Sequence, residues 1–304
     1  MDLSVNLGGI KLDNPVIPAS GTFGYGLEFA ELYDINILGS FSIKGTTLEP
    51  RFGNPLPRIA ETPSGMLNSV GLQNPGAENV VKDVFPRLKK VYRKKVIANV
   101  GGHDEESYVR AAEILSKEDI VCAVELNISC PNVKAGGMAF GTDPDKAAAI
   151  TAAVKKVCRK PLFVKLSPNV ESVAANARAA EEGGADAVSL VNTFTGMAID
   201  IERRRPVLAN NTGGVSGAGI KPIAVRMVFE AAHAVKIPVV GMGGITCAED
   251  AVEFLLAGAV AVQVGTANFT DTSACPKIID GLDAWCDAHG VKNIGELTGA
   301  LKLN

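Results

Sequence analysis

The chain alternates short apolar runs with amphipathic segments along its 304 residues. Near the N-terminus, residues 5–12 form two short alternating segments around Gly8-Gly9, the pattern of a β-hairpin. The apolar runs that follow predict eight strands, at 15–20, 36–45, 95–101, 120–124, 161–166, 186–193, 237–244 and 261–266. The segments between and after them predict helices near 28–33, 78–92, 106–115, 144–158, 173–182, 222–235, 248–256 and 276–288.

Strands that are apolar almost throughout favour parallel pairing in a sheet covered by helices. Eight strand–helix pairs therefore predict an α/β fold, a (β/α)8 TIM barrel with an N-terminal β-hairpin, and one domain over residues 1–304. An open doubly wound sheet is the alternative. Its dinucleotide-binding form is not indicated, because Gly8-Gly9 is not part of a G-x-G-x-x-G motif.

Three long insertions follow predicted strands, at 46–75, 130–142 and 194–219. Because each insertion comes after a strand, the long loops are expected on the carboxyl face of the barrel. Barrel enzymes carry their active sites on that face. The site is therefore expected among these loops and the strand ends beside them.

Composition and charge narrow the class of partner. The formal net charge is −3, and the only conspicuous basic run is Arg203-Arg204-Arg205, for which a solvated loop is the simplest interpretation. This balance argues against nucleic acid or an anionic membrane as an electrostatic partner. The longest apolar run, 254–262, is too short to span a bilayer, and the N-terminus lacks the pattern of a signal peptide.

The six cysteines are scattered and include no C-x-x-C pair. This spacing argues against a typical zinc or iron–sulfur ligand set within the chain, so no metal site is expected. In a chain of this length it indicates reduced thiols and a cytoplasmic location.

Polar or small residues stand at the end of every predicted strand. Gly243-Gly244 and Gly265-Thr266 follow the seventh and eighth strands, where barrels often bind a phosphate group, although tight turns also use glycine. The full ring of strand-end residues is Ser20, Lys44, Asn99, Asn127 with Cys130, Lys165, Asn192 with Thr193, Gly243-Gly244 and Gly265-Thr266.

Lys44 and Lys165 are flanked by apolar residues, unlike lysines on an exposed helix face. A buried ammonium group is costly unless an anionic partner meets it. Together with the neighbouring amides, the two lysines suit a flat heterocycle that gains negative charge, such as a reduced flavin. A structural ion pair with Asp or Glu is the alternative, and for Lys165 a Schiff base is a further one.

Cys130 follows a strand end rich in polar residues and precedes a segment that contains three glycines, at 136, 137 and 141. A thiol under a glycine-rich flap is suitably placed for catalysis, whereas the alternative is a small buried apolar side chain in a turn. The loop 68–74 carries amides around a glycine and could hold a small carboxylated ring, or could be a plain turn.

Four motifs together resemble the dihydroorotate dehydrogenases: Asn127-Ile-Ser-Cys-Pro-Asn132, Asn68-Ser-Val-Gly-Leu72, Phe163-Val-Lys-Leu-Ser-Pro168 and Val239-Val-Gly-Met-Gly-Gly244. The resemblance extends over essentially the whole chain. It implies an FMN-bearing barrel that oxidises dihydroorotate to orotate in pyrimidine biosynthesis.

Within that family, the membrane-bound, quinone-linked class has a serine base and an N-terminal extension, whereas Cys130 occupies that position here. The segment 133–141 is similar to the NAD-linked class (1B) rather than to the fumarate-linked homodimer (1A). Class 1B implies a partner subunit that carries FAD and a 2Fe–2S cluster, in a heterotetramer with two copies of each chain.

The resemblance also implies roles for individual residues. Cys130 would be the base that takes the C5 proton, and Lys165 would stabilise the reduced flavin near N1. The residues expected to contact FMN are Ser20, Lys44, Gly45, Asn99, Asn127, Lys165, Val191, Gly217, Gly243, Gly244, Gly265 and Thr266. The residues expected to contact the substrate are Lys44, Asn68, Ser69, Val70, Gly71, Leu72, Asn127, Asn192 and Thr193.

Three other functions remain open from the sequence. A dihydropyrimidine dehydrogenase-like reduction of uracil or thymine would use the same barrel. A flavin-free aldolase or isomerase would use Lys165 as a Schiff base. A non-catalytic binding barrel would leave Cys130 and the lysines without a role.

Overall fold

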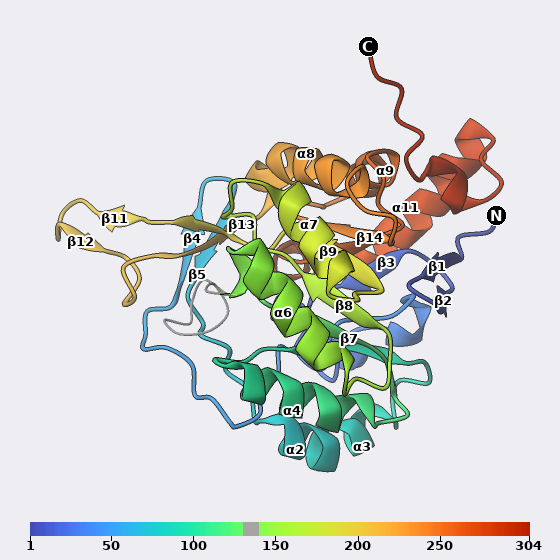
Figure 1. Cartoon of the computed structure of the whole chain (residues 1–304). Coiled ribbons are helices and arrows are strands. Elements are labelled where there is room, and N and C mark those ends of the chain that lie inside the picture. Colours follow the sequence, from blue (N-terminus) through green and yellow to red (C-terminus); the bar gives the residue numbers. More distant parts are fainter. Residues whose placement is uncertain (130–139) are drawn as a thin grey trace.

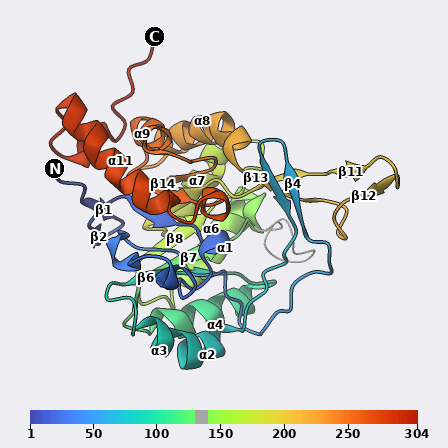
Figure 2. The same ribbon diagram turned by 180° about the vertical axis from the view of Figure 1, so that it is seen from behind.

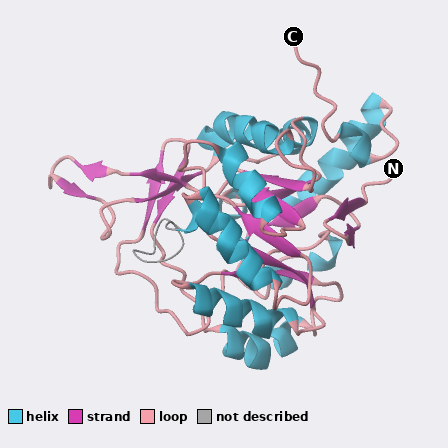
Figure 3. Ribbon diagram, in the orientation of Figure 1, coloured by secondary structure: helices cyan, strands magenta, loops and turns pink. Residues whose placement is uncertain are grey.

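The computed structural model describes residues 1–129 and 140–304. Seven parallel strands curl around a common axis with helices outside them (Figures 1 and 3). Their spatial order is β3 (Val16–Pro18), β15 (Ala261–Val264), β14 (Val239–Met242), β9 (Ala187–Leu190), β8 (Leu162–Lys165), β7 (Val121–Asn127) and β6 (Val96–Val100). Every neighbouring pair is parallel, as the continuous apolar runs predicted.

Residues 41–46 close the sheet by bonding to both of its edges. The N–H of Ser42 donates to the carbonyl of Pro18 on β3 at 3.0 Å, and the N–H of Ile43 donates to the carbonyl of Ile97 on β6 at 2.9 Å. The segment thus takes the place of the eighth strand, and the predicted (β/α)8 barrel is confirmed. It is not a regular strand, because the N–H of Lys44 turns away to the carbonyl of Gly24.

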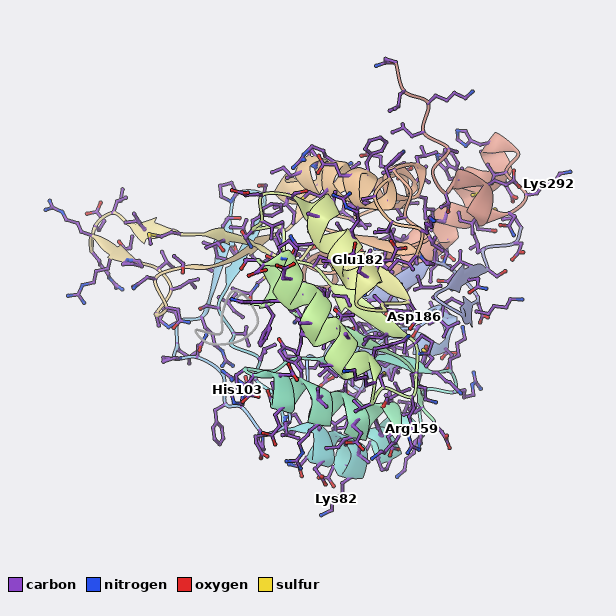
Figure 4. All side chains as sticks on the ribbon, viewed as in Figure 1. Lys82, His103, Arg159, Glu182, Asp186 and Lys292 are labelled. Carbon is purple, nitrogen blue, oxygen red and sulfur yellow. The ribbon has the colours of Figure 1, made fainter. Side chains whose placement is uncertain are left out.

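Six longer helices cover the outside of the barrel, close to their predicted positions. They are α4 (Glu105–Ser116), α6 (Pro144–Lys155), α7 (Val173–Glu182), α8 (Lys221–Ala232), α9 (Ala248–Leu256) and α11 (Ala274–His289), the last seen best from behind (Figure 2). Asp104, Asp143 and Ser172 begin α4, α6 and α7 as side-chain caps. Charged side chains such as Lys82, Arg159 and Lys292 lie on the outer surface (Figure 4).

Two predicted helices differ in the structure. The one expected near 78–92 is α2 (Ala77–Asn79), a π turn η3 (Val80–Val84) and α3 (Phe85–Leu88). The one expected near 28–33 is only the 3-10 turn η1 (Phe29–Glu31), preceded by the short α1 (Ser20–Phe23). Short 3-10 turns also occur at η2 (Ile35–Ile37), η4 (Ala218–Ile220) and η5 (Ile294–Leu297).

The N-terminal hairpin is confirmed as β1 (Val5–Leu7) paired with β2 (Ile10–Leu12). Gly8 and Gly9 have φ of 56° and 89°, a left-handed pair that glycine adopts without strain. A Cβ on Gly8 would lie 2.8 Å from the Phe163 ring and 3.0 Å from the carbonyl of Asp186. The turn therefore packs tightly against residues at the amino end of the barrel.

The long loops on the carboxyl side carry a second, antiparallel sheet that the sequence did not predict. Its order is β10 (Phe194–Gly196), β13 (Gly213–Ser216), β5 (Gly65–Asn68) and β4 (Ile59–Thr62). The paired strands β11 (Ile199–Asp200) and β12 (Arg205–Pro206) extend from it as an arm away from the barrel (Figures 1 and 2). The Arg203-Arg204-Arg205 run lies exposed at this arm, as expected of a solvated loop.

No helix within residues 1–129 and 140–304 is long and apolar enough to cross a membrane.

Candidate active site at the carboxyl end of the barrel

A cavity of about 850 Å³ lies among the strand ends and the antiparallel sheet. A volume of this size suits a mononucleotide-sized ligand together with a small second molecule. The predicted site residues that line it are Ser20, Lys44, Gly45, Asn68, Val70, Gly71, Leu72, Asn99, Asn127, Lys165, Val191, Asn192, Thr193, Gly217, Gly243, Gly244, Gly265 and Thr266. Ser69 is buried beside the cavity but does not line it, and Cys130 lies outside the described residues.

The carboxylate of Glu125, on β7, lies fully buried beneath this cavity. Burial raises the pKa of this carboxyl group, but the positive charge of Lys165 and the surrounding hydrogen bonds outweigh it and hold the pKa below its ordinary value. Glu125 is therefore an anion. Its four donors are Ser42 Oγ at 2.9 Å, Asn99 Nδ2 at 2.6 Å, Ser189 Oγ at 2.8 Å and Gln263 Nε2 at 2.6 Å.

Several polar groups at the cavity floor lack partners among the described residues. Asn99 Oδ1 and Gln263 Oε1 are buried and accept no hydrogen bond there. Lys165 is 6% exposed and makes no hydrogen bond to another described residue, although its charge acts on the Glu125 carboxylate. Buried polar groups are normally satisfied, so the two oxygens are suited to a hydrogen-bond donor and the ammonium group to an electron-rich atom.

A chain of side-chain hydrogen bonds fixes the end of β7 next to residue 130. Asn192 Nδ2 donates to Ser129 Oγ at 2.7 Å, and Ser129 Oγ donates to Asn127 Oδ1 at 2.9 Å. The hydroxyl of Tyr108 donates to the main-chain carbonyl of Asn127 at 2.8 Å. Because the oxygen of Asn127 is already engaged, its NH2 group is the part that it can offer to a ligand.

Several glycines bring the main chain close to the open space of the cavity. Gly217, Gly243 and Gly244 have φ of 115°, 125° and 80°, which side-chain-bearing residues rarely adopt. The N–H groups of Gly243 and Gly244 donate to no other described residue. A Cβ on Gly265 would meet only Ala19, at 3.9 Å. Free N–H groups and open space suit a phosphate group. The short α10 (Ala267–Thr270) follows.

Asp250 on α9 anchors the loop that follows the Gly243–Gly244 turn. Its carboxylate accepts hydrogen bonds from Lys221 Nζ at 2.6 Å and from the N–H and hydroxyl of Thr246 at 2.8 and 2.7 Å. Burial raises the pKa of Asp250, but the bonds from Lys221 and Thr246 outweigh it and lower the pKa to about 2. Lys221 also packs against Gly244: a Cβ added at Gly244 would lie 2.9 Å from the main-chain nitrogen of Lys221.

The comparisons with known proteins agree with this geometry. The model of the dihydroorotate dehydrogenase family matches residues 2–285. The chain belongs to the dihydroorotate dehydrogenase family. It is 55% identical over 302 residues to the dihydroorotate dehydrogenase B (NAD(+)) catalytic subunit of Bacteroides fragilis, covering 99% of each chain. It is 54% identical over 297 residues to the protein of the same name from Halalkalibacterium halodurans, covering 98% of this chain and 97% of the relative.

Glu125, Ser216 and Gln263 were not among the predicted site residues of this family member. Gln263 lines the cavity, and Ser216 also does so, with a 2.8 Å bond between its hydroxyl and that of Thr266. The sequence carried a signal for two of them, since Glu125 and Gln263 each interrupt an apolar run that forms a buried strand. Ser216 lies in a strand of the unexpected sheet, and its position depends on pairing with β5.

We expect Asp250→Asn to lower the free energy of unfolding at pH 7 by about 1–2 kcal/mol, after allowance for solvent screening. The folded-state pKa is depressed, so the carboxylate contributes its full stability above the unfolded pKa near 3.8 and loses it as the pH falls through about 2. Urea unfolding of both proteins from pH 7 downward measures this difference. Asp271→Asn, at the exposed ion pair with Lys277, is the control and should change little. An equal loss in both variants would contradict the role of Asp250.

Proposed function

We propose that this chain is the catalytic subunit of an NAD-linked dihydroorotate dehydrogenase, which oxidises dihydroorotate to orotate in pyrimidine biosynthesis. The observation that carries the proposal is the cavity floor, where Lys165 and the incompletely bonded carboxamides of Asn99 and Gln263 line a space of mononucleotide size. The full-length similarity to NAD(+)-linked catalytic subunits supports it.

The residues around the cavity fit FMN. The free oxygens of Asn99 and Gln263 could accept a hydrogen bond from a ring N–H, and Lys165 suits a ring edge that carries negative charge. The glycine turns suit the phosphate. The residues that would hold the cofactor are Ser20, Lys44, Gly45, Asn99, Asn127, Lys165, Val191, Gly217, Gly243, Gly244, Gly265 and Thr266. Bound FMN would accept the hydride from C6 of dihydroorotate. No side chain can act as such a hydride acceptor.

In this proposal the chain's own groups bind the substrate and move its proton. Cys130 removes the C5 proton as a thiolate, for which its pKa must lie below the ordinary thiol value of about 8.5. The carboxamides around the cavity orient the substrate ring. The proposed substrate contacts are Lys44, Asn68, Ser69, Val70, Gly71, Leu72, Asn127, Asn192 and Thr193. Of these, Ser69 does not line the cavity, and its main-chain N–H and carbonyl are already bonded to Arg58 and Asn54.

Gly265→Val tests the phosphate end of the cofactor site. The added side chain starts in open space, so the cofactor-free protein should keep its free energy of unfolding to within about 0.5 kcal/mol. The same side chain occupies the space proposed for phosphate, so the purified variant should lose its FMN. Absorbance near the flavin bands and urea unfolding measure the two properties. Gly265→Ala should lie between, and a valine variant with full FMN content would exclude this location.

Cys130→Ala tests the proposed base together with the reaction. Wild-type protein should be yellow and should lose its visible flavin absorbance when dihydroorotate is added without oxygen. The alanine variant should retain FMN, because Cys130 is assigned to the substrate. Its rate of flavin reduction should fall roughly 10²–10⁴-fold, the range for loss of a general base. Stopped-flow absorbance measures the rate. An undiminished rate would remove Cys130 from the mechanism.

We also propose that the electrons leave through a second subunit that carries FAD and a 2Fe–2S cluster, in a heterotetramer with two copies of each chain, located in the cytoplasm. The chain contains no C-x-x-C pair and no dinucleotide motif, so an internal relay to NAD has no sequence support. The B-type naming of the relatives as catalytic subunits agrees with a partner.

The isolated chain should therefore reduce artificial dyes with dihydroorotate but reduce NAD poorly. Co-expression with the flavoprotein partner should restore NAD reduction and yield a complex that contains both chains. Steady-state assays with NAD and with fumarate, run in parallel on the isolated chain, distinguish the two soluble classes. Efficient turnover with fumarate would place this protein in the homodimeric class instead.

A further inference from the structure

Glu125 has no direct access to the cavity. It is fully buried and does not line the open space, whereas Asn99, Lys165 and Gln263, which act on it, all do. Its other two donors, Ser42 and Ser189, are also buried away from the cavity. Glu125 therefore cannot touch a ligand in the cavity, and its contacts reach the ligand only through the three cavity-lining side chains.

The first influence concerns hydrogen-bond direction. A carboxylate has acceptors only, so the carboxamides of Asn99 and Gln263 must turn their NH2 groups toward Glu125. This requirement directs the two carbonyl oxygens elsewhere, and both lack partners among the described residues. The buried anion thus fixes the orientation of both cavity-lining carboxamides. With a neutral side chain at position 125, either amide could reverse.

The second influence concerns charge. The Cα of Lys165 is in register with Asn127, two residues beyond Glu125 along β7, so the lysine lies one layer nearer the cavity. The positive charge of Lys165 stabilises the Glu125 anion, and by reciprocity Glu125 opposes that charge where a ligand would meet it. A ligand that gains negative charge therefore interacts with the positive charge of Lys165 reduced by the opposing charge of Glu125.

We propose that Glu125 is a positioning residue that sets both the hydrogen-bond polarity and the net charge of the cavity floor, and thereby the affinity of the site for reduced relative to oxidised flavin. This inference rests on the proposed binding of FMN. It adds a residue that touches neither cofactor nor substrate and acts through Asn99, Lys165 and Gln263.

The test is the midpoint potential of bound FMN, measured by spectroelectrochemical titration of the purified protein, together with FMN dissociation constants for both redox states. Glu125→Gln leaves the Lys165 charge unopposed, so reduced FMN should bind roughly tenfold tighter or more relative to oxidised FMN. That ratio corresponds to an upward shift of about 30 mV for a two-electron couple. Glu125→Asp keeps the charge and should return the potential toward that of the wild type, although its stability falls.

Two further variants separate this role from a structural one. Asp250→Asn removes a lysine-bonded carboxylate near the phosphate end, and it should change the affinity of both redox states equally, with no shift of potential. Ser189→Ala removes one donor from Glu125 without touching the cavity, so it increases the negative charge felt by Lys165 and should lower the potential slightly.

Ser189→Ala removes only a hydroxyl group. If Glu125→Gln does not fold, the potential of Ser189→Ala tests whether Glu125 sets the flavin potential. An unchanged midpoint potential in Glu125→Gln would overturn the role of Glu125. If Glu125→Gln does not fold, an unchanged potential in Ser189→Ala would do so. Wild-type protein without flavin would instead overturn the proposed function, so the two failures are distinguishable.

Discussion

The buried carboxylate of Glu125 is the interaction on which the interior of this barrel depends. Its donors come from the closing segment, β6, β9 and β15, and it stands itself on β7. An anion in an apolar interior is tolerated only when its oxygens are fully bonded, so the strands must keep this arrangement. The barrel is therefore held at this level by one polar centre in addition to its apolar packing, and the cavity floor inherits its geometry from that centre.

The sequence predicted the barrel well because its signals are local. Apolar runs fix the strands, amphipathic segments fix the helices, and Gly8-Gly9 fixes the hairpin turn. The antiparallel sheet was missed because its strands are short, rich in glycine and paired with partners far away in the chain. Leu67 pairs with Val215, and Gly65 approaches Ser216 so closely that a Cβ would lie 1.9 Å from its carbonyl oxygen. Those glycines look like loop residues until their partners are known.

In the candidate site, too, features with a local sequence signal could be predicted and features that depend on distant partners could not. Residues at strand ends could be predicted, because the barrel fold places all strand ends on one face, and the structure brings them around one cavity. Ser69 was expected to contact the substrate from its place in a motif, but its side chain turns into the protein interior. Glu125 stands in the middle of a strand, where apolar packing is the ordinary expectation. Only the three-dimensional arrangement reveals that four donors converge on it.

The span of those donors along the chain has a consequence for biosynthesis. Ser42 and Gln263 contact the same carboxylate although 221 positions separate them. A ribosome must release nearly the whole polypeptide before β15 can pair with β3 and satisfy Glu125. Until then the carboxylate lacks one of its four protein donors, and the cavity floor lacks Gln263. If FMN binds as proposed, it would bind only to chains whose last strand is in place, so flavin colour in the purified protein would report complete folding.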